Sequence, residues 1–331
     1  MTPLVSVCVT TYNHEPYLAD ALDAILSQEC DFGVEIILGE DCSSDNTLEI
    51  CKQYAERYPM QITLIASAEN VGWRENYRRC VEAARGKYIA FCDGDDYWCD
   101  TNRLAEQVTL MEQNANVGLC YTLAERRDER GELIGHFPKG EGHTSLDALL
   151  HDWCVENCTT LARRDLVLAY YATEKPENRA EWLTEDLPMW LFVAAHSEVA
   201  YIDRVTAVHR VFPDSVSHST SLAKRLAFCD SSSNIKLWFD ERYNGSRQRK
   251  HLLRERMNTA LWVYSHIGSM GTFVKRWWGE IKDYPMHILS ITPYGLFVKK
   301  IVAQKQVSYE TRREIQSRNR LFRKGDACSG E

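Results

Sequence analysis

The feature that most constrains the fold is a repeated alternation of short apolar runs and amphipathic helical patterns over the first 92 residues. The apolar runs cover residues 5–10, 34–38, 62–66 and 88–92. Between them, apolar residues recur at the three- and four-residue spacing of a helix with one buried face. Strands separated by helices imply βαβ units and a mainly parallel sheet, whose ligands bind beyond the carboxyl ends of the strands. We therefore expect the loops at residues 10–15, 40–46, 67–72 and 93–96 to converge on one crevice.

The patterns farther along the chain predict additional strands and then a helical end. The expected strands lie in a hairpin over residues 117–137, at 159–162, at 198–202 and at 206–211. A helix is expected to open at Glu185, with Thr184 as its cap, and the pattern is helical after Ser221. We predict an α/β domain over residues 1–220 and a helical C-terminal region over residues 221–331.

Three carboxylates follow the fourth apolar run, at Asp93, Asp95 and Asp96, where a buried strand would emerge from the sheet. Side chains alternate along a strand, but Gly94 allows a turn in which Asp93 and Asp95 face one ligand. A hard divalent cation prefers such oxygens and usually completes its shell with substrate phosphates and water. The alternative is an acidic turn that caps a helix beginning near Thr101.

Composition describes a globular chain with reduced cysteines. The 331 residues are 44% apolar, which is ample for a core and for about two domains. The first apolar run is too short for a secretion signal or a membrane span. The twelve cysteines are scattered, which predicts buried thiols in a reducing compartment. His151, Cys154 and Cys158 lack a fourth zinc ligand nearby. We expect a cytoplasmic protein.

The formal charge of −8 argues against a nucleic-acid partner, but the charge is unevenly distributed. Residues 299–324 carry nine Lys or Arg against two Glu, a local balance of +7. Upstream, cations and aromatics are interleaved, as at Lys275-Arg276-Trp277-Trp278. This composition suits an anionic membrane surface, so the segment from Thr272 to Lys324 is a candidate for docking on the inner membrane face. The alternative is an amphipathic helical region with a solvated tail.

Five stretches recur in a known family in the same order: residues 5–13, residues 35–47, Asn70-Val71-Gly72, Asp93-Gly94-Asp95-Asp96 and Glu185-Asp186. Together they resemble the family-2 glycosyltransferases with the GT-A fold, a doubly wound α/β fold, and the likeness covers about residues 3–215. The resemblance implies an inverting glycosyltransferase that depends on Mn²⁺ or Mg²⁺. Such an enzyme moves a sugar from a nucleoside diphosphate, most often UDP, to an acceptor hydroxyl. It suggests surface polysaccharide or lipopolysaccharide assembly, with a glycan or lipid-linked glycan as acceptor.

The resemblance also implies the residues that bind the nucleotide. Thr10, Tyr12 and Glu15 would surround the base and ribose, and Asp41 would accept a hydrogen bond from the ring N–H of the base. Tyr12 could instead be a core aromatic. The loop departs from the family at Gly39-Glu40-Asp41-Cys42, where members usually carry two Asp and a Gly.

For the reaction itself, the resemblance implies that Asp93 meets ribose and metal and that Asp95 binds the metal directly. Asp186 would be the general base that takes the proton of the acceptor hydroxyl. At a helix N-terminus we expect its pKa to be lowered. Asp186 with Glu185 could instead be a first-turn dipole pair, and His209 is either a third metal ligand or a structural histidine.

Two rival functions belong to other classes. A sugar nucleotidyltransferase shares the fold type, but it should carry a glycine-rich loop after the first strand, and residues 10–15 contain no glycine. A binding or assembly subunit that has lost catalysis is the non-enzyme alternative. Asp93, Asp95 and Asp186 weigh against it.

Overall fold

The computed structural model describes residues 2–213, 215, 219 and 221–266. Over these residues the strands are β1 (Val5–Thr11), β2 (Val34–Glu40), β3 (Ile62–Ala66), β4 (Tyr88–Phe91), β5 (Tyr97–Trp98), β6 (Val117–Asp128), β7 (Leu133–Phe137), β8 (Leu161–Arg163) and β9 (Glu198–Val211). The α-helices are α1 (Leu18–Leu26), α2 (Thr47–Arg57), α3 (Trp73–Ala83), α4 (Arg103–Gln113), α5 (Leu146–His151), α6 (Arg164–Glu174), α7 (Asp186–His196), α8 (Leu222–Tyr243) and α9 (Arg249–His266). Two short 3₁₀ helices are η1 (Asn157–Thr159) and η2 (Pro176–Asn178).

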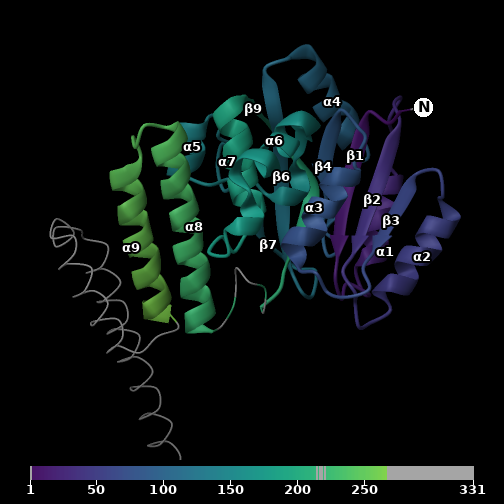
Figure 1. Ribbon diagram of the computed structural model, residues 1–331, viewed down its shortest axis with the longest axis horizontal. Coiled ribbons are helices and arrows are strands. Elements are labelled where there is room, and N and C mark those ends of the chain that lie inside the picture. Colours follow the sequence, from purple (N-terminus) through teal and green to yellow (C-terminus); the bar gives the residue numbers. More distant parts are fainter. Residues whose placement is uncertain (1, 214, 216–218, 220, 267–331) are drawn as a thin grey trace, which may run out of the picture. The chain divides into compact units, whose positions relative to one another are not determined.

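The described strands form one sheet in the order β3-β2-β1-β4-β8-β6-β9-β5, with β7 paired to β6 (Figure 1). The β3-β2-β1-β4 half is parallel throughout, as the βαβ pattern predicts. In the other half β8 is antiparallel to both β4 and β6, whereas β6 and β9 are parallel. The predicted α/β class with a doubly wound, mainly parallel sheet is confirmed. The loops after β1, β2, β3 and β4 all leave the same edge of the parallel half.

Both faces of the parallel half are covered, which explains why β1 is buried along its whole length. Val5, Val7 and Val9 point into one core cluster with side chains of α1, α2 and α4. Cys8 points into the other cluster, with side chains of α3, α6 and α7. The alternation of the two clusters along β1 follows the two-residue period of a strand.

One predicted break in the sheet is absent. The sequence predicts separate strands at 198–202 and 206–211, but β9 is continuous from Glu198 to Val211. Its register against β6 shifts so that Ile202 and Val205 face consecutive residues of β6. The two residues between them, Asp203 and Arg204, are exposed. A bulge therefore removes two polar residues from the pairing without ending the strand.

The helical C-terminal region is confirmed by α8 and α9 as far as residue 266. The described residues divide into two compact units: those up to 215 with 231–252, and residues 219 and 221–230 with 253–266. The second half of α8 therefore belongs to the first unit, where Ile235 and Phe239 join the core. No described helix is long and apolar enough to cross a membrane. The predicted membrane-docking segment lies outside the described residues.

Candidate active site

The loop from Asp93 to Asp96 lies at the carboxyl end of β4, directly beside the loop that follows β1. A Cβ on Gly94 would lie 2.8 Å from Thr11 Oγ1 and 2.9 Å from His14 Nδ1. Real side chains do not tolerate such distances, so glycine is required for this close approach. The two loops therefore meet, as the parallel topology predicts.

Asp93 is anchored by three hydrogen bonds from three different elements. The Thr10 hydroxyl and the Tyr77 hydroxyl each donate to its Oδ1 at 2.5 Å. The Asn157 amide donates to Oδ2 at 3.4 Å. Burial nevertheless raises the pKa of Asp93, although these hydrogen bonds oppose the shift. The structure thus brings together Thr10 and Asp93, both predicted to contact the donor.

Asp95 carries the least compensated carboxylate of the loop. Its side chain is 27% exposed, and the imidazole Nε2 of His14 lies 3.8 Å from Oδ2. Burial lowers the pKa of His14 to about 4, so this imidazole is neutral near pH 7. Burial and the charges of Asp96 and Asp93 raise the pKa of Asp95 to about 8. A cation beside Asp95 would stabilise the ionised form of this carboxylate.

Strand β9 fixes the far side of the loop. The backbone N–H of Arg210 donates to Asp96 at 2.9 Å, and the Arg210 guanidinium donates to the Asp95 carbonyl at 2.8 Å. His209 Nδ1 lies 3.3 Å from Asp96 and 3.8 Å from Glu156. Burial lowers the pKa of His209, but these two carboxylates outweigh burial and raise it to about 10. His209 is placed beside the acidic loop, and its role as a third metal ligand stays a prediction.

Asp41 holds the loop that follows β3. It is only 2% exposed, and its two oxygens accept the backbone N–H groups of Val71 at 2.7 Å and Gly72 at 3.0 Å. Gly72 has a φ of +85°, which glycine adopts readily. Each carboxylate oxygen has a second lone pair, so recognition of the base by Asp41 stays a prediction. The structure adds a scaffold role that the sequence did not indicate.

Tyr12 and Glu15 occupy the loop between β1 and α1. Tyr12 is 45% exposed, which excludes the alternative of a core aromatic. Glu15 accepts hydrogen bonds from the backbone and side-chain amides of Asn46, at 3.0 and 2.6 Å. Asn13, with a φ of +55°, accepts from the Ser44 backbone at 2.8 Å. These contacts join the loops after β1 and β2 and leave the Tyr12 ring accessible.

Asp186 begins α7, but its surroundings differ from the expectation in two ways. The N-cap is Glu185 rather than Thr184, and the Thr184 hydroxyl donates to Asp186 Oδ1 instead. Burial raises the pKa of Asp186, contrary to the lowering expected at a helix N-terminus, because desolvation outweighs the hydrogen bonds from the Thr184 hydroxyl and the Leu187 backbone. Helix α7 packs beside the phenol that donates to Asp93: the Phe91 ring centroid lies 5.6 Å from that of Tyr77 and 5.5 Å from that of Trp190. It therefore lies in the same region as the acidic loop.

Glu185 is buried, with only 3% of its surface exposed to solvent. Its Oε2 lies 3.5 Å from Arg74 Nε, and the Arg74 guanidinium also donates to the Trp182 carbonyl. Burial raises the pKa of Glu185 to about 7. This surrounding suits a structural carboxyl better than a group that must meet an acceptor.

Tyr77, Asn157 and His14 belong to the site but were missed by the sequence reading. Tyr77 lies within the amphipathic pattern of α3 and reads there as one more buried aromatic. Asn157 lies in a short 3₁₀ turn, and its amide reaches both the Tyr77 hydroxyl and Asp93. Of the three, only His14 could have been found from the sequence, because it is a titratable residue inside the loop at 10–15 that was expected to line the site.

No zinc site forms from His151, Cys154 and Cys158. Cys154 and Cys158 pack into the two different core clusters on opposite faces of the sheet. More generally, no group of three or more His, Cys, Asp or Glu among the described residues is arranged to hold a metal. A metal at the acidic loop would therefore depend on few protein ligands, with substrate completing its shell.

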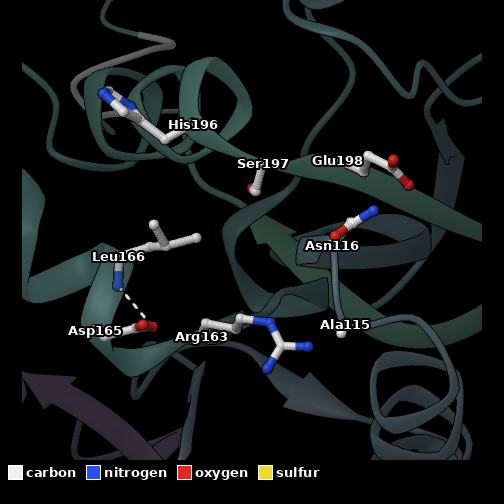
Figure 2. Close-up of a pocket in the computed structure, with 8 residues that line it drawn as sticks. All are labelled: Ala115, Asn116, Arg163, Asp165, Leu166, His196, Ser197 and Glu198. Atoms are coloured by element: carbon white, nitrogen blue, oxygen red, sulfur yellow. Dashed lines mark hydrogen bonds between the residues drawn. The ribbon is translucent and has the colours of Figure 1, made fainter.

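A separate hollow of about 440 Å³ lies at the opposite end of the sheet, where β6 and β9 begin (Figure 2). Its walls include Asn116, Arg163, Ser197 and Glu198. Arg163 donates to backbone carbonyls, including that of Val117 at 2.8 Å, and Ser197 donates to a carbonyl of α7. Because Arg163 and Ser197 already donate to backbone carbonyls of the protein, these two side chains are not available to bind a ligand in the hollow.

Comparison with known proteins agrees with the geometry. The model of the family described as "Glycosyl transferase family 2" matches residues 6–167. An uncharacterized protein of Mycobacterium bovis is 27% identical over 93% of this chain and 92% of its own length. The putative teichuronic acid biosynthesis glycosyltransferase TuaG of Bacillus subtilis is 27% identical, over 65% of this chain and 82% of its own.

Two solved structures share the fold. TarS 1–349 of S. aureus, in complex with UDP, has a TM-score of 0.50 and 16% identity, over 85% of this chain and 88% of its own. The mannosyltransferase PcManGT of Pyrobaculum calidifontis, in complex with GDP-Man and Mn²⁺, has a TM-score of 0.53 and 16% identity, over 91% and 87%. From the matching motifs, the parallel half-sheet and the carboxylates at its edge, residues 6–167 belong to glycosyl transferase family 2, and the chain has the GT-A fold of these structures.

Proposed function

We propose that this glycosyltransferase moves a sugar from a nucleoside diphosphate donor, UDP-linked in the first instance, to an acceptor hydroxyl with inversion at the anomeric carbon. The observation that carries the proposal is the meeting of two carboxylate sites far apart in sequence. Asp93 and Asp95 lie at the end of β4, and Asp186 starts α7; Tyr77 donates to Asp93, and Phe91 contacts both the Tyr77 ring and Trp190 of α7. One site suits the leaving diphosphate and the other the attacking hydroxyl.

Asp186 acts as the general base. It removes the proton of the acceptor hydroxyl while the hydroxyl oxygen bonds to the anomeric carbon and the bond to the diphosphate oxygen breaks. Inversion follows because attack and departure occur on opposite faces of that carbon. Burial raises the pKa of Asp186, which makes its ionised form a stronger base than an exposed aspartate.

The residues of the acidic loop fit a divalent cation. Among the described residues, the one imidazole within 4.0 Å of the Asp95 carboxylate is that of His14, whose lowered pKa keeps it neutral. Burial and the charges of Asp96 and Asp93 raise the pKa of Asp95, which supports a site where a cation would stabilise the ionised form. Asp95, with Asp93, would hold Mn²⁺ or Mg²⁺, and the cation would stabilise charge on the departing diphosphate. The Mn²⁺ in the complex of the P. calidifontis mannosyltransferase supports this choice.

The nucleotide would lie along the loops after β1 and β2. Thr10 meets Asp93, Asp41 lines the neighbouring loop, and the exposed Tyr12 ring is available to the base or ribose. The UDP complex of the S. aureus protein supports a uridine nucleotide. We further propose a role in polysaccharide assembly, which the likeness to the putative teichuronic acid biosynthesis glycosyltransferase supports. A place on the cytoplasmic face of a membrane is a proposal from the basic, aromatic composition of residues 272–324.

The test is a hydrolysis and transfer screen over UDP-, GDP- and TDP-sugars with Mn²⁺ or Mg²⁺. We expect nucleotide release from one donor, abolished by EDTA. Asp186→Asn serves as the inactive control. Release that survives both EDTA and Asp186→Asn would contradict the proposal, and so would the absence of any nucleotide binding.

A further inference from the structure

The segment that carries the proposed base is irregular and depends on side chains for its position. Residues 182–184, between η2 and α7, belong to no helix or strand. Buried backbone groups outside regular structure need other partners, and those partners fix where the chain runs. Whatever binds this segment therefore sets the position of Asp186.

Ser231 of α8 binds the segment on one side. Its hydroxyl donates to the Glu181 carbonyl at 2.7 Å and accepts the Leu183 N–H at 2.7 Å. Ser231 is buried, and a hydroxyl can donate and accept at once, so one side chain spans the chain around Trp182. The Trp182 ring also packs near Phe239 of α8, with 6.0 Å between ring centroids.

Arg74 of α3 binds the same segment from another element. Its guanidinium donates to the Trp182 carbonyl and faces Glu185, the residue next to the base. Side chains of α3 and α8 thus satisfy three successive residues of the segment, the carbonyls of Glu181 and Trp182 and the N–H of Leu183.

We infer that Ser231, together with Arg74, is a positioning residue for catalysis: it holds the segment that aims Asp186 without touching donor or acceptor. The inference rests on the proposed function, in which Asp186 is the base. Helix α8 lies beyond residues 6–167, which the family model matches. The inference therefore assigns a part in catalysis to a helix outside the matched region. Misplacing a catalytic group by about 1 Å can lower a rate by about 100-fold.

The test compares Ser231→Ala with Ser233→Ala, which removes a hydroxyl from the same helix that makes neither of these contacts. We expect kcat for donor turnover to fall about tenfold or more in Ser231→Ala, with UDP affinity in the presence of Mn²⁺ unchanged. Ser231→Thr keeps the hydroxyl and should recover most of the activity. Equal turnover in the two alanine variants would overturn the inference, and so would parallel losses of kcat, UDP affinity and thermal stability.

A second measurement does not require activity. Hydrogen exchange followed by mass spectrometry should show faster exchange over residues 181–187 in Ser231→Ala, and no change in the loops at 40–46 and 93–96. Ser233→Ala should leave all three regions unchanged. Unaltered exchange over 181–187 would overturn the inference even if no donor had been found. Failure of the proposed function would instead appear as wild-type protein that binds no nucleotide.

Discussion

The carboxylates on the proposed nucleotide side of the site and those on the proposed reaction side have opposite surroundings. On the nucleotide side, Glu40 and Asp41 are buried and accept backbone N–H groups: Glu40 from its own loop, and Asp41 from the loop after β3. On the reaction side, burial and like charges raise the pKa of Asp95 to about 8, and burial raises that of Asp186. Carboxylates of the first kind build loops, whereas those of the second kind are poised for a cation or a proton. The two groups should therefore respond differently to mutation.

The largest effect is expected for Asp186→Asn. The amide keeps the shape of the carboxylate but cannot accept the acceptor's proton, so turnover should fall by about 10²- to 10⁴-fold. Donor affinity, measured by calorimetry, should change little. Glu185→Gln is the matched control, because Glu185 is buried beside Arg74 and should keep far more activity. If the two variants behaved in the opposite way, Glu185 would be the base.

Asp95→Asn should weaken metal-dependent donor binding as well as rate. Asp95 would contact the cation in the ground state, so UDP affinity with Mn²⁺ should fall more than about tenfold. Loss of a residue that only supports a metal ligand already lowers metal affinity by about 10- to 100-fold, and Asp95 would be a ligand itself. Uridine, which has no diphosphate, should bind Asp95→Asn and wild type equally. EDTA should weaken UDP binding and spare uridine binding in the wild type. Equal sensitivity of uridine and UDP to EDTA would contradict the separation of roles.

Asp41→Ala should lower the free energy of unfolding even without nucleotide. It removes both hydrogen bonds from Val71 and Gly72 to a buried carboxylate, and bonds to charged groups contribute about 1.5–3 kcal/mol each. With partial relaxation we expect a loss of about 2–4 kcal/mol in urea unfolding. Asn70→Ala, which removes only a bond to the Asp41 carbonyl, is the milder control. Unchanged stability in Asp41→Ala would show that this carboxylate serves the ligand alone.

The smallest effect concerns Cys42, in the loop after β2. Its φ of +58° is unfavourable for a residue with a side chain, so Cys42→Gly should raise the free energy of unfolding by about 1 kcal/mol. Gly72→Ala, at a φ of +85° with open space around the added Cβ, should lower it by a similar amount. Thermal unfolding of both variants, compared with wild type, measures these changes in the free energy of unfolding. A destabilised Cys42→Gly would mean that the contact of the thiol with Ala68 outweighs the strain.

Much of the fold was predictable because local patterns agree with global topology. The four apolar runs became β1 to β4 in parallel, and the turn at Gly131 became the β6–β7 hairpin. The continuity of β9 was not predictable, because a bulge at Asp203 and Arg204 interrupts the apolar pattern without ending the pairing. The 1–220 and 221–331 domain division stays a prediction.

The sequence by itself determined the family, the class of fold and which carboxylates end at the edge of the sheet. Motif spacing and strand periodicity are local properties, so they are legible without coordinates. Tertiary structure alone decided what surrounds each carboxylate: the phenol of Tyr77 on Asp93, the amides on Asp41, and the burial that reverses the expected pKa shift of Asp186. Desolvation and hydrogen bonding depend on neighbours brought together by folding, so the spacing of one motif does not predict either of them.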